Sequence, residues 1–205
     1  MKKIFLIIFA IELSIDAFAL NPPVSNWVNT RNHDYVACHA GIHFQQPDTV
    51  VPVKVRLEET NFNDLMILFI PDTAKQLQDL GAVFQRGYGE LMKYAHENQL
   101  KTGKFLAWYY SVQPPWIMDI GVETDKLPSE LKGRVKSRIE KGGEVLIAHM
   151  QGPYTQLGEA YNQIESWLKQ NNRMARGNPF EIYLNDPSTV KDPSEIKTDI
   201  YQPLQ

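Results

Sequence analysis

The chain has 205 residues, a formal net charge of −3 and a single cysteine. This length suits one domain with a proper hydrophobic core. The nearly balanced charge gives no sign of a polyphosphate partner or an anionic membrane surface, and one cysteine excludes an intramolecular disulfide.

The first 19 residues have the pattern of a secretory signal peptide. Lys2 and Lys3 precede an apolar run, and Ala17-Phe18-Ala19 fits the small-residue cleavage site. The apolar run is too short to span a bilayer, which takes ~20 apolar residues. We therefore predict export to the periplasm or the medium, with a mature chain that starts at Leu20 and has no stable membrane insertion. An uncleaved amphipathic leader is the alternative.

Residues 20–48 contain Pro22-Pro23, several asparagines and scattered aromatic residues, which predicts an irregular extension. Cys38, His39 and His43, with His33 nearby, are the residue types that bind zinc or copper. Their spacing matches no closed metal site, so no metal is predicted.

The first half of the remaining chain has the pattern β-β-α-β-β. Its apolar alternation and its breakers predict strands at 51–57, 65–70, 105–110 and 116–122, with a helix that starts at Pro71-Asp72-Thr73 and runs to about Ala95. Three glycines weaken that helix and suggest a break inside it: Gly81, Gly87 and Gly89.

The second half repeats this order after a linker at 123–133. It predicts strands at 134–140, 144–150, 179–184 and 196–202 and a helix at 154–170, with a hairpin at Gly142-Gly143. The amino-acid sequence repeats as well, since VKVRLE at 53–58 is similar to VKSRIE at 135–140. The expected fold is α+β: two repeated β-β-α-β-β halves (50–122 and 134–202) related by a pseudo-twofold axis. We expect an antiparallel sheet with two long helices on one side and a central ligand cavity. A single domain then covers 49–205.

Strand alternation selects the residues that face this cavity. In the strand at 179–184, Phe180, Ile182 and Leu184 share one face, which we assign to the core under the helices. Glu181 and Tyr183 then point to the open face.

The equivalent strand of the first half gives the same division. It places Tyr109 where the second half has Tyr183, and Ala107 where the second half has Glu181. Its core face is assigned to Leu106, Trp108 and Tyr110. A single carboxylate near aromatic rings suits a cationic ligand, or it supplies a proton-transfer group. The alternative is that Glu181 lies on a solvated strand face and has no role.

Each of two further residues has two alternative roles. His149 lies on an apolar strand, where it is either a hydrogen-bonded core residue or a base in the pocket. Trp116 follows Pro114-Pro115 and either lines the mouth of the cavity or packs in the core.

The segment HMQGPYTQLGEAYNQIESWL, followed by PFEIYLNDP and KTDIYQPL, resembles the GyrI-like small-molecule-binding domain, the effector-binding domain of AraC-type regulators. The matching motifs are the turn at Gly152-Pro153-Tyr154 and the stretch from Glu181 to Pro187. The resemblance implies a duplicated α+β fold with a ligand pocket, and an acidic pocket residue at the position of Glu181. In multidrug-sensing members this carboxylate attracts lipophilic cations, and some stand-alone members hydrolyse strained cyclopropane compounds.

The chain departs from that family in two ways. PDT at 71–73 stands where a second GPY-like turn is usual, and only 48 residues precede the first strand. We therefore expect no DNA-binding domain and no nucleic-acid partner.

The sequence thus predicts an exported protein that binds an amphipathic, cationic small molecule without a cofactor. Its ligand-binding residues would be Glu181, Tyr183, Tyr109, Trp116, Tyr154 and His149. The first alternative is a hydrolase of strained electrophiles with Glu181 as its catalytic residue. The second is a protein-interaction module that uses the extension at 20–48.

Overall fold

The structure is a computed structural model, and it describes residues 53–111 and 113–205. The predicted signal peptide, the extension at 20–48 and the cysteine–histidine group all lie outside these residues. Within them, no helix is both long enough and apolar enough to cross a membrane.

The fold is α+β, as predicted, with one eight-stranded antiparallel sheet and two long helices. The strands are β1 (Lys54–Phe62), β2 (Leu65–Ala74), β3 (Thr102–Tyr109), β4 (Trp116–Thr124), β5 (Lys136–Glu140), β6 (Gly143–Gln151), β7 (Phe180–Tyr183) and β8 (Lys197–Pro203). The helices are α1 (Leu80–Glu97) and α2 (Leu157–Gln170), each preceded by a short 3-10 turn, η1 (Leu77–Asp79) and η2 (Tyr154–Gln156). A third turn of this kind, η3 (Pro193–Glu195), precedes β8.

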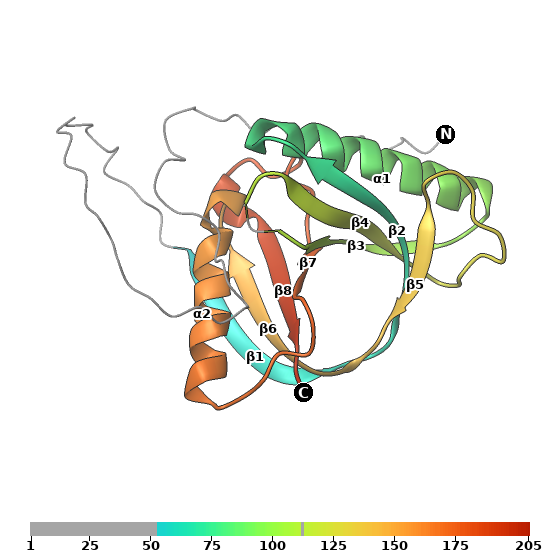
Figure 1. Ribbon diagram of the computed structural model, residues 1–205. Helices are drawn as coiled ribbons and strands as arrows, with labels where there is room; N and C mark the ends of the chain where they lie inside the picture. Colours follow the sequence, from blue (N-terminus) through green and yellow to red (C-terminus); the bar gives the residue numbers. More distant parts are fainter. Residues whose placement is uncertain (1–52, 112) are drawn as a thin grey trace.

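The two halves of the chain are joined by one long, bent pair of strands. β1 pairs with β6 from Lys54↔Gln151 to Phe62↔Gly143, and β2 pairs with β5 from Leu65↔Glu140 onward, so that the register continues unshifted across the bend. Figure 1 shows β1 and β2 as one arc that carries the sheet from the side of α2 to the side of α1. The sheet is therefore strongly curved, with an outer and an inner face.

The strand order is β1-β6-β8-β7-β3-β4-β2-β5. The counterparts in the two halves are β1 and β5, β2 and β6, β3 and β7, and β4 and β8. Exchanging each strand for its counterpart gives the same order in reverse. The central pair is β3 with β7, in which Ala107 lies directly opposite Glu181. The topology thus fits a duplicated unit, and the spatial twofold symmetry of the halves stays a prediction.

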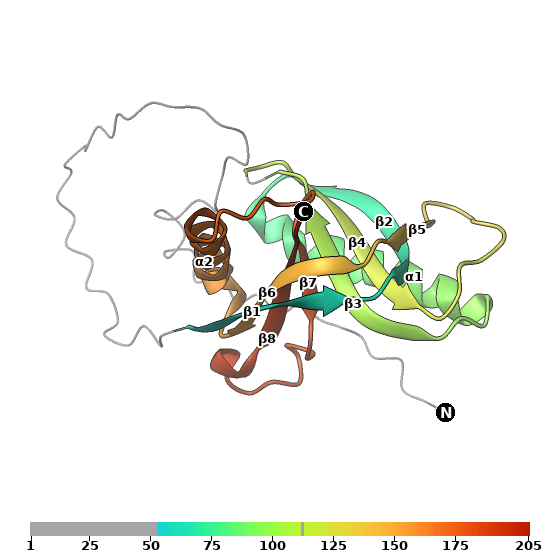
Figure 2. The same cartoon turned by 90° about the horizontal axis from the view of Figure 1, so that it is seen from below.

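Both helices lie on the outer face of the sheet, as Figure 2 shows from below. Helix α1 packs on β2 and β4, and α2 packs on β6, β1 and β8. Each helix buries one apolar stripe of the kind that spacings of three and four residues produce. The buried residues of α1 are Val83, Phe84, Gly87, Tyr88, Leu91, Tyr94 and Ala95, and those of α2 are Ala160, Ile164 and Leu168.

The inner face carries a third apolar cluster that contains no helix residue. Its buried members are Leu65, Ile67, Leu106, Trp108, Phe180 and Ile182, with Phe62, Phe69 and Tyr201 packed against them. The assignment of Phe180, Ile182, Leu106 and Trp108 to the helix-covered face is therefore wrong, and Leu184 and Tyr110, assigned with them, are exposed. The physical reason is curvature: the bent sheet covers its own inner face, so both faces are apolar and alternation cannot tell them apart.

The boundary between β2 and α1 also differs from the prediction. Pro71, Asp72 and Thr73 do not start a helix, because β2 continues to Ala74 and pairs with β4 along this stretch. β5 pairs with β2 only as far as Phe69, so one edge of β2 is free beyond it, and a free edge tolerates proline. Helix α1 then runs unbroken through its three glycines.

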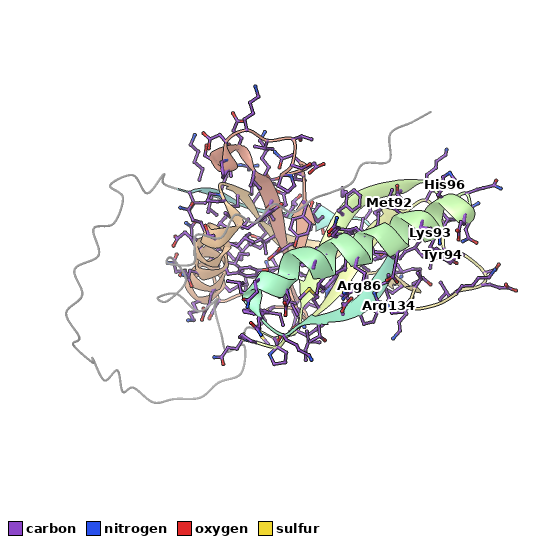
Figure 3. The ribbon with its side chains drawn as sticks, turned by 90° about the horizontal axis from the view of Figure 1, so that it is seen from above. Arg86, Met92, Lys93, Tyr94, His96 and Arg134 are labelled. Carbon is purple, nitrogen blue, oxygen red and sulfur yellow. The ribbon has the colours of Figure 1, made fainter. Side chains whose placement is uncertain are left out.

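Asp72 holds α1 to the sheet. Its carboxylate accepts hydrogen bonds from Arg86 on α1 (2.8 Å) and from Arg134 (3.0 Å), which also pairs with Glu90 on α1. Figure 3 shows Arg86 and Arg134 next to each other at the side of the helix. Burial by itself raises the pKa of Asp72, but the hydrogen bonds from Arg86, the Thr73 N–H and Arg134 outweigh it and lower that pKa.

Candidate ligand-binding site

Glu181 is a buried carboxylate in the central strand pair, with 2% of its surface exposed. It points toward the helices, because its neighbours Ala107 and Ile200 both belong to the clusters beneath α1 and α2. Its Oε1 accepts a hydrogen bond from the Tyr161 hydroxyl of α2 at 2.8 Å. Its Oε2 accepts one from the Tyr183 hydroxyl at 2.7 Å.

Aromatic rings from both halves gather around this carboxylate. The Tyr183 ring meets Phe84 of α1 edge-on, with centroids 6.0 Å apart, and meets Tyr154 in the same way at 5.8 Å. Phe84 in turn lies 6.4 Å from Tyr109 and 5.7 Å from Tyr88. The site is thus built where α1, β3, β7 and the start of α2 come together.

The electrostatics of the site are those of a charge held away from water. Burial raises the pKa of Glu181, and the hydrogen bonds from Tyr183 and Tyr161 only partly oppose this. Burial also raises the pKa of Tyr183 and Tyr161 well above the ordinary value, and the charge of Glu181 adds to the rise. Tyr109 behaves in the same way, although a hydrogen bond with Tyr183 works in the opposite direction. The tyrosines are therefore neutral hydroxyl donors.

Among the described residues, no lysine, arginine or histidine forms an ion pair with Glu181. A buried carboxylate without a counter-charge is costly, and it is relieved by taking up a proton or by meeting a cation. The arrangement can therefore hold a cation against π-faces or move a proton. Within residues 53–111 and 113–205, no cluster of three histidine, cysteine or carboxylate side chains is placed to hold a metal ion.

Most of the residues predicted from the sequence come together here. Tyr183 and Tyr154 contact each other, and Tyr109 reaches the same group through Phe84 and Tyr183. Tyr154 is presented by the turn at Gly152, whose φ of 150° favours glycine. Trp116 is partly buried against the α1 cluster that also contacts Tyr109 and Tyr183.

The structure places His149 elsewhere. Its strand neighbours are Arg56 and Asp199 on the inner face, whereas Glu181 faces the helices. The His149 Nδ1 lies 2.8 Å from Asp199 Oδ1, and its Nε2 lies 3.4 Å from Glu58. Because its ring is occupied by these two carboxylates on the opposite face, His149 is not brought to the Glu181 group.

Sequence reasoning missed Tyr161 as a site residue. It lies in the helical stripe of Leu157, Tyr161, Ile164 and Leu168, and this spacing by itself indicates a core position. The available signal was its hydroxyl, because a tyrosine buried in an apolar stripe needs a hydrogen-bond partner. Phe84 and Tyr88 of α1 were also missed, because they too lie in the buried apolar stripe of their helix.

A hollow of about 450 Å³ lies on a different part of the sheet. It is lined by Asn61, Phe62, Asn63, Asp64, Leu65, Lys104, Glu123 and Tyr201. It does not include Glu181, and most of its polar side chains are exposed to solvent. Among the residues that the structure describes, the Glu181 group combines burial, a carboxylate without an ion-pair partner and converging rings, and it is therefore the candidate ligand site.

The chain belongs to the family of GyrI-like small molecule binding domains, whose family model matches residues 73–205. The expectation drawn from the turn at 152–154 and the stretch at 181–187 is thereby confirmed. No curated protein matches the sequence significantly.

Solved structures with the same fold are similar in shape and distant in sequence. The DNA complex of EcmrR contains a chain with 14% identity and a TM-score of 0.66, and the match covers 74% of this chain and 57% of that one. A hydrolase from Listeria innocua has 13% identity and a TM-score of 0.57 (73% and 92% covered). SAV2435 bound to tetraphenylphosphonium has 13% identity and a TM-score of 0.53 (73% and 94% covered). These likenesses establish the fold, and this chain spans little more than half the length of EcmrR.

Proposed function

We propose that this protein binds an amphipathic organic cation at Glu181, between α1, α2 and the sheet. The observation that carries the proposal is the buried carboxylate of Glu181, which has tyrosine hydroxyls for partners and no cationic partner within residues 53–111 and 113–205. An organic cation would bring the missing charge at a smaller desolvation cost than a compact ammonium ion. Its apolar groups would contact the faces of Tyr183, Tyr154 and Phe84.

Binding of this kind requires the site to open. Both oxygens of Glu181 are occupied by Tyr161 and Tyr183, and the rings around them are in contact. A ligand would therefore replace the hydroxyl of Tyr161, which is carried by α2, and leave the strand residue Tyr183 in place. SAV2435, which shares this fold, binds tetraphenylphosphonium, and this makes the lipophilic cation a suitable probe.

The test is a comparison of charged and neutral probes on two proteins. Calorimetry would measure the binding of tetraphenylphosphonium and of neutral triphenylphosphine oxide to the wild type and to Glu181→Gln. We expect the substitution to weaken binding of the cation by more than ~1 kcal/mol, about fivefold in Kd, and to leave binding of the neutral probe nearly unchanged. Equal losses for both probes would show that the carboxylate does not select charge.

A hydrolase is the second candidate, and it rests on the same carboxylate. Burial raises the pKa of Glu181 toward the range in which a carboxylate serves as a general base, and a fold neighbour from Listeria innocua is described as a hydrolase. Chromatography of strained cyclopropane substrates would detect a product that disappears in Glu181→Ala. Stoichiometric binding without a product would favour the binding function.

We also propose that the protein acts outside the cytoplasm, on the basis of Lys2, Lys3 and the motif Ala17-Phe18-Ala19. Mass spectrometry of the protein from its native host should find a mature N-terminus at Leu20. An intact Met1 on the protein in the cytoplasmic fraction would contradict export. The absence of a nucleic-acid partner likewise remains a prediction.

A further inference from the structure

Thr198 of β8 carries a buried hydroxyl that the fold does not use. The residue is 1% exposed, and its Oγ1 has no hydrogen-bond partner among the described residues. A buried hydroxyl without a partner costs free energy, and native proteins contain few of them. Valine has the same branched shape, suits a strand equally well and would avoid this cost. The presence of the hydroxyl therefore requires an explanation.

Strand pairing places Thr198 at the edge of the Glu181 group. Thr198 lies directly opposite Tyr183, whose hydroxyl donates to Glu181 at 2.7 Å. Glu181 itself lies opposite Ile200, so Thr198 is its diagonal neighbour on the same face of the sheet. Diagonal neighbours on two paired strands are ~7–8 Å apart, a separation that a long side chain and a small ligand group can bridge.

The turn that presents Tyr154 meets the sheet at the same place. The Gly152 N–H donates to the carbonyl oxygen of Ile196, two residues before Thr198, at 2.9 Å. The Tyr154 ring contacts the Tyr183 ring edge-on, with centroids 5.8 Å apart. Thr198, Tyr183 and the turn at 152–154 therefore form one corner of the candidate site.

The first half of the chain has no hydroxyl at the equivalent position. In β3 and β4, Tyr109 lies opposite Met118. In the equivalent strand pair, β7 and β8, Tyr183 lies opposite Thr198. The carboxylate of the site likewise has an apolar counterpart, Ala107. The second half thus differs from the first by a carboxylate and a hydroxyl at neighbouring positions of one face.

We infer that Thr198 is a specificity-determining residue of the Glu181 site, and that the preferred ligands are protonated amines with at least two N–H groups. One N–H donates to the carboxylate of Glu181, and a second donates to Oγ1 of Thr198. Hydrogen bonds from a charged donor are stronger than neutral ones, so such an amine gains more than a cation whose charged centre is fully substituted. This inference rests on the proposed function and narrows its ligand class.

Calorimetry with two matched probes tests the inference, at a pH at which the amine is fully protonated. Dibenzylammonium has two N–H groups, whereas dibenzyldimethylammonium has none and carries the same rings and the same charge. We expect the wild type to bind dibenzylammonium about tenfold more tightly. Thr198→Val should lose most of this preference, and Thr198→Ser, which keeps the hydroxyl, should retain it.

Protein stability gives an independent readout of the same hydroxyl. Thr198→Val removes a hydroxyl without a partner, so the urea midpoint should stay equal or rise. Thr124 is the matched control, because it is also buried on a strand but donates to the Lys126 carbonyl oxygen at 3.2 Å. Thr124→Val should lower the midpoint. If Thr198→Val lowers it as much, the hydroxyl serves the fold and the inference is overturned.

Three binding results would also overturn the inference: equal affinity of the wild type for both probes, a wild-type preference in Thr198→Val, or loss of the preference in Thr198→Ser. Glu181→Gln, titrated with dibenzyldimethylammonium, separates this failure from failure of the proposed function. If Glu181→Gln weakens binding of this probe while Thr198→Val leaves the ratio of the two Kd values unchanged, the cation site stands and the role of Thr198 falls. If the wild type binds neither probe, both fall together.

Discussion

Glu181 carries its charge where an apolar residue would be expected. It is enclosed by the sheet, α2 and a group of rings, and two tyrosine hydroxyls are its hydrogen-bond partners. The opposite position in the central strand pair, Ala107, has no polar group at all. The charge therefore destabilises the fold, and such a strongly perturbed buried carboxylate is a candidate for a role in binding or catalysis.

This cost should appear as a pH dependence of stability. The pKa of Glu181 is raised in the folded protein above its ordinary value of 4.5, so this residue destabilises the fold as the pH rises from 4.5 through its folded pKa. The unfolding free energy of Glu181→Gln minus that of the wild type should therefore increase over that pH interval. Above the interval this difference should stay constant. Urea denaturation from about pH 4 to about pH 8 would measure the difference.

The matched control for this prediction is Glu97→Gln at the exposed end of α1, where the carboxylate is 60% exposed. It should follow the wild-type pH profile closely. If Glu181→Gln also follows that profile, the glutamate is not under the strain that its burial implies.

At the residue scale, the sequence identified the carboxylate but misjudged its surroundings. Strand alternation correctly separated Glu181 and Tyr183 from Phe180 and Ile182, because alternation depends only on backbone geometry. It could not say which of the two groups faces the helices, since that depends on how far the sheet bends. Tyr161 was not identified as a site residue, because helical periodicity shows that its side chain is buried but not which group its hydroxyl contacts.

At the scale of elements, helix α1 contributes Phe84 to the candidate site. Two of its glycines have different surroundings. A Cβ on Gly87 would lie 2.7 Å from Cδ1 and 3.2 Å from Cγ2 of the fully buried Ile120 on β4. A Cβ on Gly89, half a turn further on, would meet no atom within 4 Å. Gly87 therefore permits close packing of the helix on the sheet, whereas packing does not require a glycine at position 89.

Two alanine substitutions should consequently have opposite effects. Gly89→Ala should stabilise the protein by ~0.5–1 kcal/mol, since alanine restricts the unfolded chain and favours the helix. Gly87→Ala should destabilise it by ~1–3 kcal/mol, because Ile120 must move in a packed core. Denaturant midpoints measure both changes. A stabilising Gly87→Ala would mean that α1 does not rest on β4 as described.

The elements themselves were largely predictable. All eight strands and both helices were expected near their observed positions, because apolar periodicity decides such segments locally. The exception was the start of α1, where Pro71-Asp72-Thr73 has the local signature of a helix N-terminus. Pairing of β2 with β4 overrides that signature, and pairing partners are not visible in a local pattern.

At the scale of the whole molecule, the bend between β1 and β2 determines the overall shape. At the bend Gly142 lies against the other strand: a Cβ there would be 2.3 Å from the Phe62 carbonyl oxygen and 2.7 Å from the Asn63 carbonyl carbon. The Gly142 N–H donates to Asp64 at 2.9 Å. Only a residue without a side chain lets the two paired strands approach this closely at the bend.

We expect Gly142→Ala to destabilise the protein by at least ~1–3 kcal/mol, because backbone atoms rather than a flexible side chain must move. Gly158→Ala in the first turn of α2 is the control, since a Cβ there meets nothing within 4 Å. It should be neutral or stabilising by up to ~1 kcal/mol. Thermal or urea unfolding of the two variants would decide, and equal stabilities would contradict a close approach of the strands at Gly142.

The duplicated sequence predicted the order of elements in both halves. It could not predict the curvature, because the close approach of residues 62–64 and 142 at the bend joins segments from different halves and is not visible in either half alone. The prediction that Glu181 points to the face opposite the helices is wrong, because Glu181 lies under the helices. The inner face carries its own apolar cluster, and three members of that cluster, Phe62, Leu65 and Tyr201, also line the hollow described above.

The central claim is that the carboxyl group of Glu181, whose pKa is raised by burial, meets the charge of a cationic ligand. Calorimetric titration with tetraphenylphosphonium in buffers of different ionisation heat measures the protons that are released on binding. Between pH 4.5 and the raised pKa of Glu181, we expect the wild type to release up to one proton and Glu181→Gln to release none. Binding of the cation without proton release throughout this interval, and with equal affinity in both proteins, would contradict the account.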